Sequence, residues 1–198
     1  AGDLHSIVAA LENGKTVLID MASLSGLFEL FLSSIISSKI LNKRKRDYIA
    51  SPEEFKKSGP ISIVMEEAQR VLGRGDNNEG NIFAQICNEG RKFGVGLIAI
   101  TQQPKLINDI LISQFNTLII LSISDDRDFN ILSGVSKKPL GKLKKEIQSL
   151  MPGEAIISSP SSPFALPLKI ELYDTHRRNI KRPKKSGGYT GSFKNFFS

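Results

Sequence analysis

Two adjacent carboxylates, Glu66 and Glu67, follow the apolar run ISIVM at residues 61–65, which has the composition of a buried strand. An ATPase that transfers phosphate to water needs one acid to hold hydrated Mg²⁺ and a second to orient or deprotonate the attacking water. Ligands of open parallel sheets bind beyond the carboxyl ends of the strands, so this pair is well placed for that chemistry. The alternative is that both acids only begin a helix, whose dipole favours negative charge there.

A second candidate strand, residues 95–101, ends in the polar run Thr-Gln-Gln-Pro. The carboxamide of Gln102 can hydrogen-bond a γ-phosphate or its water and so sense the nucleotide state. Arg91 and Lys92 lie at the lip of the same strand, where the preceding helix runs into it. Alone, Gln102 is explained as a strand cap and Arg91 as a surface charge. Together with the acid pair, these strand-tip features are hard to explain as packing, and they indicate a phosphate site.

The string Gly14-Lys15-Thr16 matches the end of a phosphate-binding loop, G-x-x-x-x-G-K-[ST], but the first glycine of that motif is replaced by Ala9. A phosphate-binding loop also follows a strand and opens a helix, so that helix amides point at the phosphate. Here a predicted helix precedes the string and a predicted strand follows it. We therefore interpret it as a helix-to-strand turn.

The composition is that of a globular protein and gives little support to a metal or disulfide framework. The 198 residues include one cysteine and two histidines far apart in sequence, so neither an internal disulfide nor a histidine metal site is expected. The longest apolar stretch, residues 27–41, is interrupted by Glu29 and Lys39 and is too short for a membrane span. The first residues lack the charged, apolar and cleavage-site segments of a secretion signal, so none is expected. We expect a cytoplasmic protein with no membrane contact.

The net charge of +7 is unevenly distributed along the chain. Seven of the 27 Lys and Arg residues, and none of the 20 Asp and Glu residues, lie in residues 175–198. The first 174 residues are therefore neutral as a whole. We expect two parts, an α/β domain over residues 1–174 and a basic, aromatic C-terminal tail over residues 175–198.

Short β-branched runs alternate with longer amphipathic stretches, which is the pattern of a parallel sheet with crossover helices. We expect strands at residues 16–20, 61–65, 95–101, 117–122, 154–158 and 166–172. We expect helices at residues 4–11, 27–46, 81–93, 105–114, 127–132 and 140–150, and a short helix after Ser51. The last two strands should form an antiparallel hairpin at the sheet edge. The predicted fold class is α/β with a mostly parallel sheet.

The chain resembles the HerA-type hexameric DNA translocases of archaea and bacteria, within the FtsK/HerA group of RecA-like P-loop ATPases. The resemblance covers about residues 15–172 and is carried by VLID, IVMEEAQR, EGRKFGVGLIAITQQP and LMPGEAIISS. It implies a partial RecA-like P-loop ATPase core with helices on both faces of the sheet, a C-terminal hairpin and an extended basic tail. The family's Walker A loop and β-barrel are expected before Ala1, so the chain resembles a C-terminal portion. One departure is Gln69, where the family usually has His.

The resemblance implies a role for each candidate residue. Glu66 would hold Mg²⁺ through water, Glu67 would be the catalytic carboxylate, and Gln102 would be the polar sensor. Arg91 matches the family's GRK element and would complete the site of the neighbouring subunit, with Lys92 as a second candidate for contacting the nucleotide. The implied cofactors are ATP and Mg²⁺, and both need the N-terminal segment that carries the Walker A loop.

The implied function is that of an ATP-driven translocase or helicase that acts on double-stranded DNA as a ring, with a hexamer as the full-length form. End resection of DNA double-strand breaks with a NurA-like nuclease is part of the same expectation. The isolated chain should not bind ATP tightly, because the amides and lysine of a phosphate-binding loop dominate phosphate binding. The alternatives are a non-catalytic DNA-binding or assembly module of the same fold, and related translocases of conjugation or chromosome segregation.

Several basic regions are candidates for contacting the DNA backbone. Residues 73–78, just after the acid pair, form a Gly-rich loop that contains Arg74 and that we favour as a channel loop. Lys137 and Lys138 belong to a second basic cluster and residues 43–46 to a third, although charge runs are usually solvated faces. The tail is explained either by packing on an adjacent subunit, as in the family, or by direct DNA binding.

Overall fold

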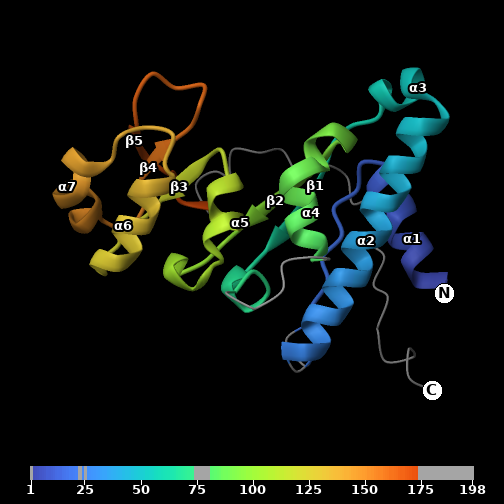
Figure 1. The fold of residues 1–198 in the computed structure, drawn as a ribbon, viewed down its shortest axis with the longest axis horizontal. Coiled ribbons are helices and arrows are strands. Elements are labelled where there is room, and N and C mark those ends of the chain that lie inside the picture. Colours follow the sequence, from blue (N-terminus) through green and yellow to red (C-terminus); the bar gives the residue numbers. More distant parts are fainter. Residues whose placement is uncertain (1, 22–23, 25, 74–80, 174–198) are drawn as a thin grey trace.

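Within the part of the chain that the structure describes, the strands form two sheets rather than one. A computed structural model of the chain describes residues 2–21, 24, 26–73 and 81–173. The parallel sheet consists of β1 (Ile61–Met65) and β2 (Val95–Ala99). The antiparallel sheet contains, in spatial order, β3 (Leu118–Ile120), β4 (Glu154–Ser158) and β5 (Leu166–Lys169). Figure 1 shows the parallel pair among the helices of the N-terminal half and the antiparallel sheet at the other end of the molecule.

Helices α2 (Gly26–Ala50) and α4 (Ile82–Glu89) cover one face of the parallel pair. Two further helices, α1 (Gly2–Glu12) and α3 (Pro52–Lys57), pack against α2. The long α2 and the shorter α4 contact each other, and both contact β2, so they lie side by side against the sheet (Figure 1). Every second strand residue faces this layer, and Ile61, Met65 and Val95 join Ile40 and Phe83 in the hydrophobic core.

The opposite face of the parallel pair is open in the part of the chain that the structure describes. Val64 and Ile98 lie opposite each other in the register and are 58% and 49% exposed, and the next residue on this face, Ile100, is 50% exposed. The expectation of helices on both faces is therefore wrong for the described residues. An apolar strand face that lacks a covering helix is unusual for a parallel sheet.

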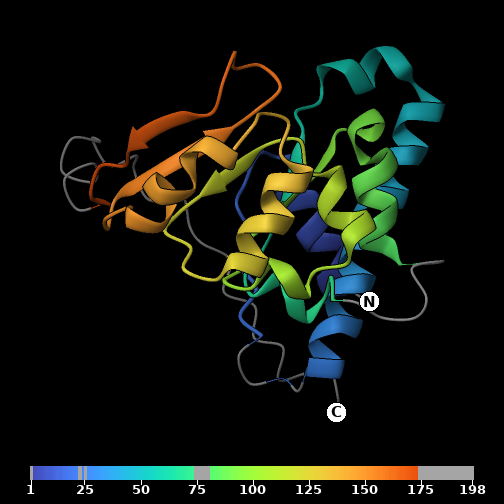
Figure 2. The same cartoon turned by 60° about the vertical axis from the view of Figure 1, so that its left-hand side comes forward.

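The C-terminal half is built from short helices and the antiparallel sheet. Its helices are α5 (Asp109–Gln114), α6 (Asp126–Val135) and α7 (Lys144–Ser149). Along the whole of the described chain, the 3₁₀ turns are η1 (Ala68–Arg70), η2 (Gly90–Phe93), η3 (Pro104–Leu106) and η4 (Gly141–Leu143). Side chains define where helices begin, since Asn108 accepts from the Ile110 N–H and caps α5. Leu111 and Phe129 belong to the same core as Phe83, so the two halves share one interior. Figure 2 shows α5 next to α4, and these two helices contact each other. None of the described helices has the length and apolarity to cross a membrane.

Two further expectations are wrong. Residues 16–20 form no strand, and Leu18 is 93% exposed, because no described strand offers them a backbone ladder. The sheet is not mostly parallel, because β3 runs antiparallel to β4 and pairs Leu118 with Ser158. A short apolar run predicts a buried strand but not the direction of its neighbour. The predicted hairpin of β4 and β5 is confirmed, and it lies in this antiparallel sheet.

The string Gly14-Lys15-Thr16 closes a helix, as its interpretation as a turn predicts. Gly14 has a φ of +69°, the left-handed conformation that glycine adopts without steric cost. Its N–H donates to Leu11 O, and the Lys15 N–H donates to Ala10 O, both at 3.0 Å. These two bonds define a Schellman cap at the end of α1. The glycine therefore serves a helix C-terminus, and a phosphate loop would need a helix N-terminus at this place.

Arg44 of α2 is buried, with 3% of its surface exposed, and it holds the starts of both parallel strands. Its Nε donates to Phe93 O at 3.1 Å, Nη1 to Ser58 Oγ at 2.8 Å, and Nη2 to Gly59 O at 3.1 Å. Residues 58–59 lead into β1, and Phe93 leads into β2. A Cβ on Gly94, whose φ is +62°, would lie 2.6 Å from Nη2, so glycine is required beside the guanidinium.

Replacing Arg44 by Met should lower the free energy of unfolding by about 2–4 kcal/mol, because buried carbonyl groups lose their donors. Arg44→Lys should recover little of this loss, since an ammonium group lacks the planar fork of donors. Urea unfolding followed by circular dichroism measures the difference. Arg46→Met, at an exposed position of the same helix, is the control. A wild-type midpoint for Arg44→Met would contradict the assignment.

Candidate functional site

The carboxyl ends of β1 and β2 are held level at one edge of the parallel sheet. The register pairs Met65 with Ala99. Pairing continues beyond both strands, because the Ile100 N–H donates to Met65 O and the Ala68 N–H donates to Ile100 O, each at 2.9 Å. Because Ile100 makes both of these backbone hydrogen bonds, they fix the segment between Met65 and Ala68 relative to the end of β2.

This edge brings together three of the predicted site residues. Glu66 and Glu67 occupy the turn that directly follows β1, and Gln102 lies just beyond β2. All three are exposed, so their polar groups are available to a ligand. The expectation that the acid pair and the carboxamide share one strand-tip edge is confirmed, while their chemical roles stay predictions.

A hydrogen-bond chain connects the acid pair to the end of β2. Gln69 Nε2 donates to Glu67 Oε2 at 2.5 Å, and Thr101 Oγ1 donates to Gln69 Oε1 at 2.5 Å. The Gln103 N–H donates to Thr101 Oγ1 at 3.0 Å and closes the turn that contains Gln102. Sequence reasoning assigned no role to Gln69 or Thr101. Their positions in the sequence could have identified them, since Gln69 lies two residues after Glu67 and Thr101 lies one residue before Gln102.

Arg91 and Lys92 lie at the other edge of the parallel sheet. Both belong to η2, which precedes the first residue of β2, and β2 alone spans roughly 16 Å at the rise of an extended strand. Arg91 and Lys92 thus lie where the helical segment runs into β2, as expected, and this is the opposite edge from Glu66 and Glu67 within one chain. Lys92 Nζ lies 5.4 Å from the ring centroid of Tyr48, so part of its role is packing against α2. Arg91 is exposed and can reach another molecule.

The donor set at the acid edge suits a magnesium ion that is held mainly by water and phosphate. Among the described residues no group of three or more His, Cys, Asp or Glu side chains is placed to hold a metal ion. Magnesium usually keeps several waters and takes one or two carboxylates plus substrate phosphates, so a single exposed carboxylate such as Glu66 fits it. Burial raises the pKa of the Cys87 thiol to about 11, so the thiol is protonated near neutral pH and is a poor nucleophile.

The candidate DNA-contacting residues are only partly described. Arg74 and the loop around it lie outside the described residues, as does the tail at residues 175–198. Lys137 is exposed and Lys138 half-buried in the loop after α6, where the Lys138 N–H donates to Ser136 Oγ at 3.3 Å. These two lysines belong to the half of the molecule with the antiparallel sheet, and β1 and β2 belong to the other half (Figure 1).

The loop after Gln102 is anchored to α6 by Lys105. Lys105 Nζ lies 2.7 Å from Asp125 Oδ2 and 3.5 Å from Asp128 Oδ2, and its N–H donates to Asp128 Oδ1 at 2.8 Å. Asp128 is buried, and Asp125 caps α6 by accepting from two backbone N–H groups. The ammonium of Lys105 holds the pKa of Asp125 at about 2, below its usual value. The anchor joins the strand-tip loop to the C-terminal half.

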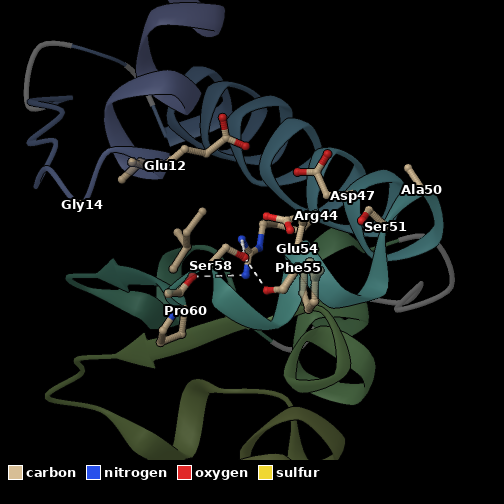
Figure 3. Close-up of a pocket in the computed structure, with 13 residues that line it drawn as sticks. Glu12, Gly14, Arg44, Asp47, Ala50, Ser51, Glu54, Phe55, Ser58 and Pro60 are labelled. Carbon is tan, nitrogen blue, oxygen red and sulfur yellow. Dashed lines mark hydrogen bonds between the residues drawn. The ribbon is translucent and has the colours of Figure 1, made fainter.

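A cavity of about 390 Å³ lies near the start of β1, away from the acid pair. Figure 3 shows Arg44 in its centre, with Glu12, Asp47 and Glu54 contributed by α1, α2 and α3. Lys43 bridges Glu12 and Asp47 at 2.8 and 2.6 Å. Glu12 and Asp47 are thus engaged by Lys43, Glu54 pairs with Lys57 within α3, and Arg44 bonds the segments that enter the strands. The candidate acid pair lies at the opposite end of β1.

Comparison with solved structures defines the class of fold. The genome-packaging NTPase B204 of Sulfolobus turreted icosahedral virus 2, solved with ATP-gammaS, superimposes with a TM-score of 0.56 and 18% identity over 83% of this chain and 72% of that one. B204 of Sulfolobus turreted icosahedral virus superimposes with a TM-score of 0.54 and 17% identity, over 79% and 66% of the two chains. The chain therefore has an α/β fold of the P-loop ATPase type in partial form, with a small parallel and an antiparallel sheet.

Sequence comparison identifies the relatives. The chain is homologous to the HerA-family helicases over most of its length. It is 29% identical to the DNA double-strand break repair helicase HerA of Pyrococcus furiosus over 94% of the chain and 38% of the relative. It is 33% identical to HerA of Saccharolobus solfataricus over 85% of the chain, and 33% of that relative is covered. The chain thus spans well under half the length of these relatives. No family model matches it.

The Lys105 anchor should make stability depend on acid pH. The pKa of Asp125 is depressed to about 2, so its contribution is complete above the usual carboxyl pKa near 3.8 and is lost as the pH falls towards 2. Asp125→Asn keeps an oxygen that can cap α6 but removes the charge. We expect the urea midpoints of the wild type and this variant to differ above pH 4 and to converge at pH 2.

Glu54→Gln, which removes an exposed pair with Lys57, is the control for this measurement. It should leave the pH dependence of the wild type nearly unchanged, because exposed pairs contribute little. A constant difference between Asp125→Asn and the wild type from pH 7 to pH 2 would show that the Lys105 pair does not cause the pH dependence.

Proposed function

We propose that the chain is the C-terminal part of the ATPase domain of an ATP-driven, ring-forming DNA translocase or helicase. One observation carries the proposal, namely that Glu66, Glu67 and Gln102 share the edge at which adjacent parallel strands end. This is where open parallel sheets bind ligands. Homology to HerA-family helicases supports the same function. The domain would cover residues 1–174, followed by the basic tail.

The open face of the parallel pair supports a larger ATPase domain. Val64, Ile98 and Ile100 present apolar side chains on a face without a covering layer among the described residues. Parallel sheets are found almost only with both faces covered, because their strands are apolar on both sides. The relatives are two and a half or more times as long as the matched region, so they have the chain needed for such a cover.

The proposed roles follow from position. Glu66, first after β1, would hold Mg²⁺ through water, and ATP phosphates would complete the coordination. Glu67 would orient the attacking water and accept its proton. Gln102 would hydrogen-bond the γ-phosphate or that water. The segment with the Walker A loop would supply the main phosphate contacts, since Gly14-Lys15-Thr16 ends a helix.

Arg91 would act on the nucleotide of a neighbouring subunit. Its place at the opposite edge of the sheet from Glu67 excludes a contact within one chain without large rearrangement, and supports a contact across a ring interface. An arginine supplied by a neighbour stabilises the charge that develops on the transferred phosphate. Lys92 would contact the same nucleotide more weakly, because its ammonium group also packs on Tyr48.

Double-stranded DNA would be the substrate of the ring, which we propose to be a hexamer. Arg74, Lys137 and Lys138 would contact the phosphate backbone, and the tail would contact either DNA or an adjacent subunit. The relatives carry the name of double-strand break repair helicases. We extend that function to this protein, with a NurA-like nuclease as partner in end resection.

Glu67→Gln in the full-length protein should lower steady-state ATP hydrolysis at least ~100-fold while ATP binding persists, because an amide cannot accept the proton of the attacking water. Hydrolysis is measured by phosphate release with and without duplex DNA. Glu53→Gln, at an exposed position on α3, is the matched control. Absence of hydrolysis in the wild-type full-length protein would favour the alternative, a non-catalytic DNA-binding or assembly module. Unchanged hydrolysis in Glu67→Gln would contradict the catalytic role of Glu67.

The isolated 198-residue chain should show no micromolar ATP binding in the same series, because it lacks a phosphate loop. Steady hydrolysis by the isolated chain that Glu67→Gln abolishes would contradict the need for a further segment.

Arg91→Ala and Glu67→Gln subunits should complement each other. Each variant alone should hydrolyse ATP poorly, but in a 1:1 mixed ring roughly a quarter of the interfaces pair an intact Glu67 with an intact Arg91 of the neighbour. Phosphate release by the mixture should therefore exceed the mean of the two variants. Arg127→Ala, at an exposed position on α6, should behave as wild type. A mixture no more active than that mean would exclude the contact between subunits.

A further inference from the structure

We propose that Gln69 is a positioning residue for Glu67, and that it couples the Glu67 carboxylate to the end of β2 where Gln102 lies. The inference rests on the proposed function, because it concerns the reaction in which Glu67 takes part. Gln69 would act through Glu67 and would not itself contact ATP or the reacting water. Gln69 is thus added to the strand-tip residues as the side chain that positions them.

Neighbouring groups determine the direction of each hydrogen bond that links Thr101, Gln69 and Glu67. The hydroxyl of Thr101 accepts from the Gln103 N–H, so its own proton is free to point at Gln69. The Gln69 oxygen accepts that proton, and its amide nitrogen must then face the Glu67 carboxylate, which can only accept. The carboxylate fixes the orientation of the carboxamide, because a flipped Gln69 would turn its oxygen toward Glu67 and lose that bond.

The backbone at Glu67 shows why a restraint is needed. Glu67 has φ 48° and ψ 44°, and it is the only non-glycine residue with positive φ among the residues that the structure describes. This left-handed conformation is unfavourable for a residue with a Cβ, and such residues cluster at functional sites. Ala68, the next residue, is fully buried and donates its N–H to Ile100 O. The backbone is thus anchored on one side, while the carboxylate is held by Gln69.

The restraint leaves the carboxylate capable of chemistry. Gln69 is a neutral donor and occupies Oε2 of Glu67, so the charge is retained and Oε1 can face a water. Without this bond an exposed glutamate samples several rotamers, and the fraction of time in the reactive position falls. The loss should therefore appear in kcat and not in the KM for ATP.

The same bonds link Glu67 to the nucleotide sensor. Gln102 lies in the turn that the Gln103–Thr101 bond closes. A movement of Gln102 toward a γ-phosphate would displace Thr101 Oγ1 and, through it, the carboxamide of Gln69. The link gives the protein a means to set the position of Glu67 according to whether ATP is bound.

The test uses Gln69→Leu, Thr101→Val and the double variant in the full-length protein. We expect Gln69→Leu to lower kcat 10-fold or more with a KM change below about 2-fold, since only the position of Glu67 is affected. The double variant should be no slower than Gln69→Leu, because both act through one chain of bonds. Affinity for a non-hydrolysable ATP analogue and the melting temperature should stay at wild-type values. Gln114→Leu, at an exposed glutamine of α5, is the matched control.

Gln69→His gives a readout that a merely structural residue would not give. A neutral imidazole has one donor and one acceptor and can replace both bonds, whereas an imidazolium has two donors and cannot accept from Thr101. We expect kcat within about 3-fold of wild type at pH 8.5, and a fall through the histidine pKa that is absent in the wild type.

The outcomes separate this inference from the proposed function. If the wild-type protein hydrolyses no ATP, the proposed function fails, and if Glu67→Gln keeps full hydrolysis, the proposed role of Glu67 fails. This inference fails in either case. If Glu67→Gln is inactive but Gln69→Leu keeps the wild-type kcat, only the inference is overturned. It is also overturned if kcat, analogue affinity and melting temperature fall together and Gln69→His restores none of them, because that result defines a structural role.

Discussion

The parallel ladder between β1 and β2 is the interaction on which the rest of the structure depends. Its register places Met65 opposite Ala99, and two further backbone bonds to Ile100 carry the pairing past the strands. Because parallel strands end at the same edge, the acids after β1 and the amide after β2 are brought together without any contact between their side chains. A shift by one residue would turn every strand side chain to the other face and part the two tips.

Two polar anchors at opposite ends keep this ladder in place. At the amino end, Arg44 joins α2 to the segments that enter β1 and β2 with three hydrogen bonds to neutral oxygens. At the carboxyl end, Lys105 joins the loop after Gln102 to α6 through Asp125 and Asp128. Arg44 and Lys105 both have structural roles. The number of Lys and Arg residues in the chain therefore says little about which ligands it binds. The excess charge of the chain lies in the tail instead.

The division of the molecule into two sheets bears on how such an ATPase would work. The parallel half carries the acid pair, and the antiparallel half carries Lys137 and Lys138. A single hydrophobic core and the Lys105 anchor connect the halves, so movement at the strand tips can pass to the C-terminal half. Under the proposed function, the exposed apolar face of β1 and β2 is where we propose that further chain of the ATPase domain packs.

The sequence alone determined the local features of this protein. Apolar runs and capping residues located β1, β2, the β4–β5 hairpin and most helices, and the acids after ISIVM marked the candidate site. Only the tertiary structure decided that β3 runs antiparallel, that residues 16–20 pair with no described strand and that Arg91 lies at the far edge from Glu67. It also revealed the Gln69–Thr101 link. The physical reason is that periodicity reports burial, whereas strand direction and side-chain bonds depend on partners distant in the chain.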